Sequence, residues 1–488
     1  MPTLNNETTH MRYIDFFSRA RMGRMRLAAL AVLATALACS TDKILQVTDP
    51  DVARPDALVG AAALPTLRAG AVGNFGVAYN GGASDVEQVH LAGLVSDEFI
   101  NTETFPTRIE IDQRAMTLSN TSLVGTFFDL TRARASSELA LNTYKSFAKT
   151  AADSTGLPEV MALNGLTYIL FAENYCGAVP VSFQAPDGSF TFGGPESTNT
   201  LLDSAVSKFN QALAIPGGPG APLTATFKNL ASVGKGRALL DKGDYPGAAA
   251  AVTAVPTTFQ YNYLHSETTP RQNNGTWSLT QSVGRFGEAD KEAGIGLPFA
   301  SDGDLKRAGG VIDPRVADSL ARRGSSGSPK GFDGATNQMV QAKYPVRSSA
   351  ITVADGVEAR LIEAEAALNA GDPVGALTIL NALRSNAALL SLRGYAANSL
   401  PPLTLQATTA AQVDQLFHER AYWLYLTSHR LGDLRRLIRQ YLRDVNTVFP
   451  NGPYFKGGIY GTDVNVPVPQ QEQNNPSYTP GSCKQNAA

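Results

Sequence analysis

Two segments share one pattern, and that pattern limits the fold more than any other feature of the sequence. "ASVGKGRALLDKGDYPGAAAAV" occupies residues 231–252, and "EARLIEAEAALNAGDPVGALTILNALR" occupies residues 358–384. Each carries a helical run, then Gly-Asp-x-x-Gly-Ala, then a second helical run. Gly243 and Gly371 suit the position just past a helix end, where a left-handed backbone costs glycine little. Pro373 suits the first turn of the next helix, because its missing N–H is harmless there. Each segment therefore predicts a pair of antiparallel helices.

The two predicted pairs resemble tetratricopeptide repeats, in which helix pairs stack into a superhelix. Two unrelated helical hairpins are the alternative. Residues 256–350 are rich in Gly, Pro, Ser and Asn and show little helical period, which predicts irregular structure with a few short strands. We therefore predict a mainly α fold, with one domain over residues 51–488. Its tetratricopeptide-like scaffold of helical pairs covers about 51–255 and 351–449, around a loop-rich insert at 256–350. An extended tail, 450–488, ends the chain.

The N-terminal segment predicts export. Residues 1–26 carry five arginines, and an apolar run follows at 27–38. A basic segment, a short apolar run and small residues before a cleavage point are typical of a secretory signal. The run is too short to span a bilayer. A buried core helix is the alternative, but the arginines and the polar residues after Cys39 argue against it.

The ending "ALAC" resembles a bacterial lipoprotein signal, in which the cysteine becomes the lipidated first residue. We therefore expect a signal peptide at residues 1–38, lipid attachment at Cys39 and a tether at 39–50. Acyl chains on Cys39 would hold the protein on a membrane.

The mature chain would keep two further cysteines, Cys176 and Cys483. Disulfides persist outside the cytoplasm, where an exported protein resides. Sequence gives neither the distance nor the geometry that a disulfide needs. A disulfide and a pair of free thiols are both compatible with the sequence.

The stretch "HERAYWLYLTSHRLGDLRRL", residues 418–437, places acids and arginines beside aromatic residues. If the helix is continuous, Glu419 and Arg430 share one face and Asp433 lies close to it. This spacing predicts one semi-buried network of ion pairs with a structural role. The net charge of −2 disfavours a nucleic-acid partner. His418 lacks a second histidine four residues later, so the zinc-protease pattern is absent.

An enzyme is the rival class. "SDEF", residues 96–99, offers adjacent acids, and a glycoside hydrolase needs two carboxylates. Adjacent acids more often form a polar network, however, and the sequence has no G-x-S-x-G motif and no phosphate-binding loop. We expect no catalytic residue, no metal site and no cofactor.

The segment "ERAYWLYLTSHRLGDLRRL" resembles the C-terminal signature of the SusD/RagB family. That signature reads Glu-Arg, a hydrophobic stretch, Glu-Gly-x-Arg, two residues, and Asp-Leu-x-Arg. The matching residues are Glu419, Arg420, Arg430, Asp433, Leu434 and Arg436. Thr427 and Ser428 stand where the family usually has Glu-Gly. The segments at 171–181, 359–384 and 466–478 are also similar to family motifs, in the same order.

The resemblance implies a non-enzymatic surface lipoprotein of the outer membrane, anchored by its lipid. It would capture an oligomer, commonly a glycan although a peptide stays open, and pass it to a SusC-like TonB-dependent barrel transporter. A periplasmic repeat-type adaptor and a carboxylate-dependent glycan hydrolase are the alternatives. Glycan capture needs aromatic faces. The candidate ligand contacts are Trp277, Tyr261 and Tyr263 in the insert and Tyr79 in "NFGVAYNGG".

Overall fold

The computed structural model describes residues 60–82, 85–150, 152–184, 189–217, 221–305, 312–320 and 329–488. All of them lie in one compact unit, Leu58–Ala488. The predicted signal peptide, Cys39 and the tether lie outside the described residues. Within the described residues, no helix is both long and apolar enough to cross a membrane.

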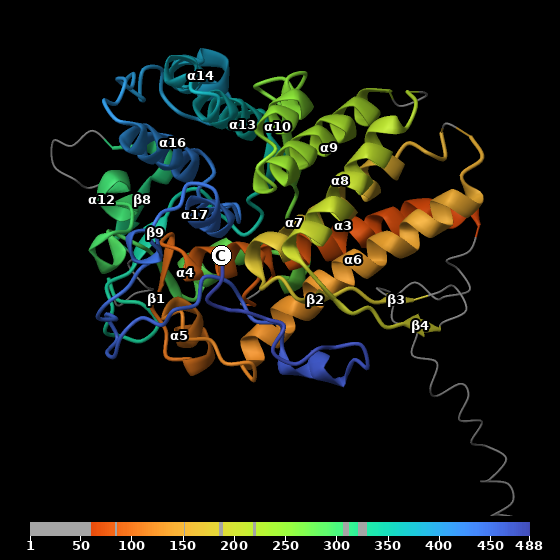
Figure 1. The fold of residues 1–488 in the computed structure, drawn as a ribbon, viewed down its shortest axis with the longest axis horizontal. Helices are drawn as coiled ribbons and strands as arrows, with labels where there is room; N and C mark the ends of the chain where they lie inside the picture. The colour runs from red at the N-terminus through yellow and green to blue at the C-terminus, as the bar shows by residue number, and fades with distance from the viewer. Residues whose placement is uncertain are drawn as a thin grey trace, which may run out of the picture. The chain divides into compact units, whose positions relative to one another are not determined.

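Helices dominate the fold (Figure 1). They are α3 (Leu64–Asn80), α4 (Gln88–Val95), α5 (Pro106–Asp112), α6 (Thr121–Phe147), α7 (Leu157–Asn174), α8 (Thr198–Ala214), α9 (Ala221–Asp241), α10 (Tyr245–Val252), α11 (Gly275–Trp277), α12 (Phe299–Gly303), α13 (Gly356–Asn369), α14 (Pro373–Ser385), α15 (Ala387–Leu392), α16 (Thr409–Trp423) and α17 (Arg430–Arg439).

The strands are short and pair two by two, always antiparallel. The pairs are β1 (Phe99–Asn101) with β7 (Phe286–Glu288), β2 (Val179–Pro180) with β5 (Pro195–Glu196), β3 (Phe183–Gln184) with β4 (Phe190–Thr191), β6 (Gln260–Tyr263) with β10 (Ile351–Asp355), and β8 (Asp318–Leu320) with β9 (Met339–Gln341).

The long helices pack as successive pairs. Helix α3 lies on α6, α7 on α8, α9 on α10, and α13 on α14. Neighbouring pairs meet through α6 and α7, α8 and α9, and α10 and α13. The two hairpins recognised in the sequence are therefore adjacent in space, although the insert separates them in the chain. The predicted mainly α, tetratricopeptide-like scaffold is confirmed.

The structure explains why each named position of the Gly-Asp-x-x-Gly turn carries its residue. Gly243 adopts φ 78° and Gly371 adopts φ 79°, in the left-handed region that glycine tolerates. Asp244 then caps α10 by accepting a hydrogen bond from the backbone N–H of Gly247. A Cβ at Gly247 would lie 2.2 Å from the Asp244 carboxylate, so the second glycine leaves room for the cap. Asp372 caps α14 in the same way.

Strands β6 and β10 close the base of the insert. Between them lie short helices and the strands β7, β8 and β9, so the prediction of irregular structure with a few short strands holds. The tail is extended and runs back over the scaffold. Val466 forms a bridge with Tyr175, at the end of α7, and Cys483 forms a disulfide with Cys176.

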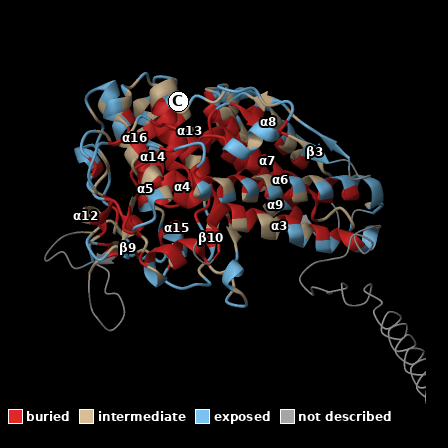
Figure 2. Cartoon of the chain, turned by 90° about the horizontal axis from the view of Figure 1, so that it is seen from below, coloured by how far each residue is buried: buried red, intermediate tan, exposed pale blue. Residues whose placement is uncertain are grey.

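Burial is concentrated where the helical pairs meet (Figure 2). Every residue of α7 is buried, which places this helix at the centre of the scaffold. Close packing there requires small residues. A Cβ at Gly165 of α7 would lie 2.8 Å from the Phe209 ring of α8.

Candidate functional site

The signature segment is not one continuous helix. Helix α16 ends at Trp423 and α17 begins at Arg430. In the turn between them, Leu426 and Ser428 have φ of 52° and 60°, which breaks the helix. The prediction that Glu419, Arg430 and Asp433 form one network on one helical face is therefore wrong, because it assumed an unbroken helix.

The three predicted residues instead join three separate sets of buried ion pairs. The Glu419 carboxylate contacts Arg315 at 2.8 Å and Arg384 at 2.6 Å. The Asp433 carboxylate contacts Arg420 at 2.8 Å and Arg436 at 2.7 Å. The Arg430 guanidinium contacts Asp97 at 2.6 Å. Each set bridges residues distant in the chain or the two helices of the signature, so the arrangement is structural.

Neighbouring arginines determine whether the carboxyl groups of Asp433 and Glu419 are ionised. Burial alone would raise the pKa of Asp433, but Arg420 and Arg436 hold that pKa well below its ordinary value. Glu419 behaves likewise: burial opposes its ionisation, and Arg315 lowers its pKa below the ordinary range. Both carboxylates are therefore ionised and paired at neutral pH.

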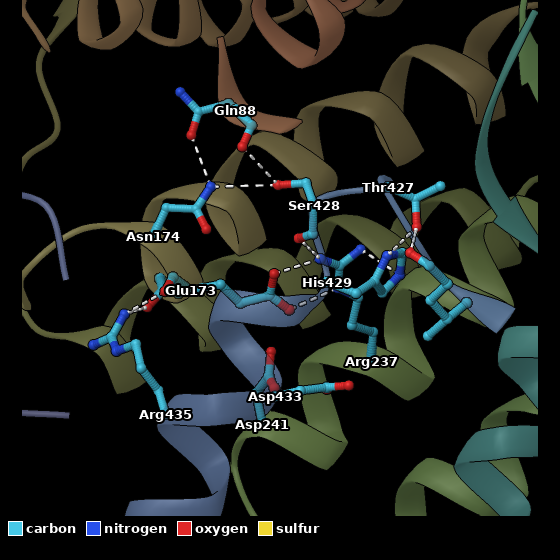
Figure 3. Close-up of polar contacts among 12 residues, drawn as sticks. Gln88, Glu173, Asn174, Arg237, Asp241, Thr427, Ser428, His429, Asp433 and Arg435 are labelled. Atoms are coloured by element: carbon cyan, nitrogen blue, oxygen red, sulfur yellow. Dashed lines mark hydrogen bonds and ion pairs between the residues drawn. The ribbon is translucent and has the colours of Figure 1, made fainter. Parts of the chain in front are cut away.

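The turn itself is a junction of several helices (Figure 3). Arg237 of α9 pairs with Glu173 of α7, with an Nε to Oε1 distance of 2.6 Å. The same guanidinium donates to the backbone carbonyl of Ser428 at 2.9 Å.

The Ser428 hydroxyl donates to the Gln88 carbonyl of α4 at 3.2 Å. The Thr427 hydroxyl lies 2.9 Å from Nδ1 of His429. Thr427 and Ser428, which stand where the family usually has Glu-Gly, thus use their hydroxyls to make hydrogen bonds inside this buried turn.

The acids of "SDEF" belong to the same buried region. Asp97 pairs with Arg430, and Glu98 accepts a hydrogen bond from the backbone N–H of Leu426 at 3.0 Å. Burial raises the pKa of Glu98 to about 8. Both side chains are buried, so a substrate cannot reach this pair of carboxyls.

The prediction that Tyr79 and Tyr261 contact a ligand is wrong, because both side chains are buried. Tyr79 is 1% exposed, and its hydroxyl donates to the Thr427 carbonyl at 2.7 Å. Tyr261 is also buried, and its hydroxyl donates to Glu159 at 2.7 Å. Both rings support the scaffold and cannot contact a ligand at the surface.

Tyr263 and Trp277 have different surroundings. Tyr263 is half-buried, with its ring against His265 and in close contact with Gly76. Its role is to pack β6 on α3. Trp277 is half-buried in the short helix α11, which Asn274 caps, rather than in the expected open loop. The Arg347 guanidinium lies 5.2 Å from the centre of the Trp277 ring. Trp277 keeps part of its surface in solvent and stays a candidate contact.

Three exposed phenylalanines form a surface that the sequence did not single out. Phe105 precedes α5, Phe332 lies between β8 and β9, and Phe455 lies in the tail; they are 43%, 41% and 45% exposed. We call these three rings the aromatic platform. Phe105 directly precedes α5, and contacts made by Arg285 and Lys456 bring the other two segments close to it.

Cationic side chains tie the platform together. The Arg285 guanidinium lies 4.6 Å from the centre of the Phe105 ring and 4.3 Å from that of Phe332. Lys456 lies 5.7 Å from the centre of the Phe455 ring. Lys456 also pairs with Asp333, next to Phe332. One arginine and one lysine thus link all three segments.

Main-chain contacts hold the same segments in place. The N–H of Phe332 donates to the Gly284 carbonyl at 2.7 Å, and that of Asp333 donates to the Thr102 carbonyl at 2.9 Å. The Lys456 ammonium donates to the Glu103 carbonyl at 3.0 Å. The platform is therefore preorganised rather than a set of loose loops. The signal in the sequence was an aromatic residue close to glycines in polar segments, as in "KGFDGATN" and "PYFKGGIY".

The platform offers aromatic faces, cations and the carboxylate of Asp333, which Lys456 engages. Across the ranges described above, no group of three or more His, Cys, Asp or Glu residues could hold a metal ion.

No family model matches the sequence, and no curated protein matches it. Solved structures do match the fold. A SusD superfamily protein from Bacteroides thetaiotaomicron VPI-5482 aligns with a TM-score of 0.59 at 13% identity, over 86% of this chain and 99% of that one. A SusD superfamily protein from Bacteroides vulgatus ATCC 8482 gives 0.56 at 15% identity, over 86% and 98%. A putative sugar binding protein from the latter organism gives 0.56 at 14% identity, over 87% and 99%. The chain therefore has the fold of the SusD superfamily, as its sequence motifs predict.

Proposed function

We propose that this protein is a non-enzymatic binding protein that captures an oligosaccharide at the aromatic platform and passes it to a SusC-like TonB-dependent transporter. The observation that carries the binding proposal is the set of three exposed phenylalanine rings whose segments Arg285 and Lys456 link. Monomeric proteins seldom leave grouped large apolar side chains in water without a use for them. Structures of the same fold include a putative sugar binding protein and a carbohydrate binding protein, which agrees with a glycan ligand.

The chemistry of the platform suits a sugar. The C–H faces of a sugar ring pack on aromatic faces, and its hydroxyls need polar partners at the edge. Phe105, Phe332 and Phe455 supply the faces. Arg285 and Asp333 stand beside them as donor and acceptor. An oligomer gains from several rings at once, because each added contact comes without a new loss of translational freedom.

Phe332→Ala should weaken glycan binding by roughly thirtyfold, since truncating a binding hot spot commonly costs 2 kcal/mol or more. The melting temperature should change little, because the ring is exposed. Isothermal titration of residues 40–488 with a glycan selected on an array would measure the affinity. Phe147→Ala is the matched control: this ring is equally exposed but ends α6, outside the platform. Equal affinity of the Phe332 variant and the control would remove the platform from the ligand site.

Trp277→Ala is expected to weaken binding by a similar factor of about thirty if the ligand extends along the insert. The melting temperature should stay within a few degrees, because the residue is only half-buried in a short helix. The same titration, together with a thermal melt, tests this. A large drop in melting temperature with unchanged affinity would instead assign Trp277 and Arg347 to packing of the insert.

We infer that Cys39 anchors the protein in the outer membrane with the platform outside the cell. The support is the lipoprotein-like ending of the apolar run. Cys39→Ala should move the protein from the membrane fraction to the soluble fraction. External protease should degrade the wild type on intact cells, whereas it would spare a periplasmic adaptor. Continued sedimentation of the variant with membranes, with uptake of labelled fatty acid, would contradict the anchor.

A further inference from the structure

A short hairpin in the tail, residues 452–460, carries Phe455 of the aromatic platform. The backbone N–H of Tyr460 closes it by donating to the Gly452 carbonyl at 2.9 Å. Tyr454 and Tyr460 are both buried, with their ring centres 5.1 Å apart. These two tyrosines therefore face the body of the protein, while Phe455 is 45% exposed.

Each tyrosine bonds to a buried acid from a different part of the chain. The Tyr454 hydroxyl donates to Oδ2 of Asp112, the last residue of α5, at 2.5 Å. The Tyr460 hydroxyl donates to Oε1 of Glu292, in the insert, at 2.6 Å. Asp112 is 1% exposed and Glu292 is 6% exposed. We call these two hydrogen bonds the tyrosine latch, because they hold the hairpin against both α5 and the insert.

Asp112 is buried with only partial compensation for a negative charge. Its Oδ2 also accepts the backbone N–H of Asn101 at 3.0 Å, whereas its Oδ1 accepts no hydrogen bond from the described residues. Lys456 is the nearby cation, and its ammonium is paired with Asp333. Burial therefore raises the pKa of Asp112 to about 7, although the bonds from Tyr454 and Asn101 oppose this.

Glu292 has further negative charge beside it. Its Oε2 accepts no hydrogen bond from the described part of the chain. Arg114 is the nearby cation, but its guanidinium donates to backbone carbonyls. Asp112 and Asp97 both act on Glu292, and Arg430 pairs with Asp97. Burial and the Asp112 carboxylate therefore raise the pKa of Glu292 well above its ordinary value.

The protons on these two acids link the hairpin to pH. An open hairpin would return both carboxyls to water, where such groups titrate at about pH 4. The closed hairpin then binds protons that the open hairpin has released, so opening becomes more favourable as the pH rises, by up to about tenfold per pH unit for each proton. For Asp112 this dependence extends from about pH 4 to about pH 7, and it levels off above.

We propose that the tyrosine latch makes the aromatic platform sensitive to pH: the hairpin stays closed in a mildly acidic medium and opens progressively as the pH rises, which removes Phe455 from the binding surface. The proposal adds regulation to the glycan-binding function proposed above and rests on it. The movement of the hairpin itself can be measured without a ligand.

Amide hydrogen exchange of a peptide spanning residues 452–460, corrected for the intrinsic effect of pH on exchange, measures the opening. In residues 40–488 the opening constant should rise at least about tenfold between pH 5.5 and pH 7.5. In the double variant Asp112→Asn/Glu292→Gln it should change less than about twofold, because the neutral side chains still accept from the tyrosines but release no proton. Asp414→Asn is the control, because Asp414 is an exposed acid paired with Arg443, and it should follow the wild type.

Asp112→Asn alone is the second variant, should the double variant fail to fold, and it should reduce the rise. A wild type without the rise, or a double variant with the full rise, would overturn the latch. Titration with a glycan selected on an array, at the same two pH values, tests the link to binding. The affinity should fall at least threefold at the higher pH in the wild type and stay constant in the double variant. Constant affinity in the wild type would overturn the regulation. A pH-dependent hairpin in a folded protein that binds no glycan would overturn the proposed function and leave the latch.

Discussion

Arg430→Ala should lower the free energy of unfolding by about 3–5 kcal/mol, because removing one member of a buried pair leaves the other charge uncompensated. Arg430 contacts both oxygens of Asp97, at 2.6 and 2.8 Å, and both side chains are buried. The Asp97 carboxylate also accepts the backbone N–H of Leu297 at 2.9 Å. The pair therefore joins α17 to the segment after α4 and to the insert, and the truncation would loosen all three.

Urea unfolding followed by circular dichroism measures the change. Arg443→Ala is the matched control, because Arg443 pairs with Asp414 at 2.8 Å on the exposed surface. Exposed pairs contribute about 1 kcal/mol or less, so the control should unfold almost like the wild type. Glycan affinity of the folded Arg430 variant should barely change, because the Arg430 guanidinium is engaged by Asp97 and not by a residue of the platform. A normal unfolding curve together with lost binding would instead place the ligand site at the turn between α16 and α17.

Removing the Cys176–Cys483 disulfide should destabilise the protein by up to about 5 kcal/mol. The two cysteines are 307 residues apart, and a cross-link that closes so long a loop restricts the unfolded chain strongly in the entropy model. Cys483→Ser also frees the end of the tail, which folds back on itself through a bond from the N–H of Val464 to the carbonyl of Gln485 at 2.8 Å. Phe455 lies in the same tail, so glycan affinity should fall as well.

Peptide mapping without reductant should recover Cys176 and Cys483 as one linked species. Thermal melts with and without reductant should then differ for the wild type and coincide for Cys483→Ser. Two separately alkylated thiols in the untreated protein, or an unchanged melt after reduction, would contradict the prediction.

Local chemistry explains what the sequence could predict. The Gly-Asp-x-x-Gly turns contain their own cap and left-handed glycine, so residues within one segment determine them. The three sets of ion pairs in the signature segment could not be predicted in the same way. Its partners, Asp97, Arg315 and Arg384, come from other elements, and the break after Trp423 depends on contacts made by Ser428 with α4 and α9.

The candidate site likewise depends on contacts between residues that are distant in the chain, which the sequence could not predict. An isolated tyrosine in a Gly-rich segment suggested a ligand contact at Tyr79, but its burial depends on the distant Thr427. The aromatic platform was missed because no single segment contains it. Phe105, Phe332 and Phe455 become one surface only after Arg285 and Lys456 connect their loops.

The way the platform loops are attached has a consequence for how this protein can change. Their backbones are fixed by main-chain hydrogen bonds and by the Lys456 contact with the Glu103 carbonyl, none of which uses the rings themselves. A substitution at position 105, 332 or 455 therefore leaves these backbone contacts in place, although it removes the contact of that ring with Arg285 or Lys456. A library that randomises these three positions is therefore expected to change the proposed binding surface and to keep the helical scaffold.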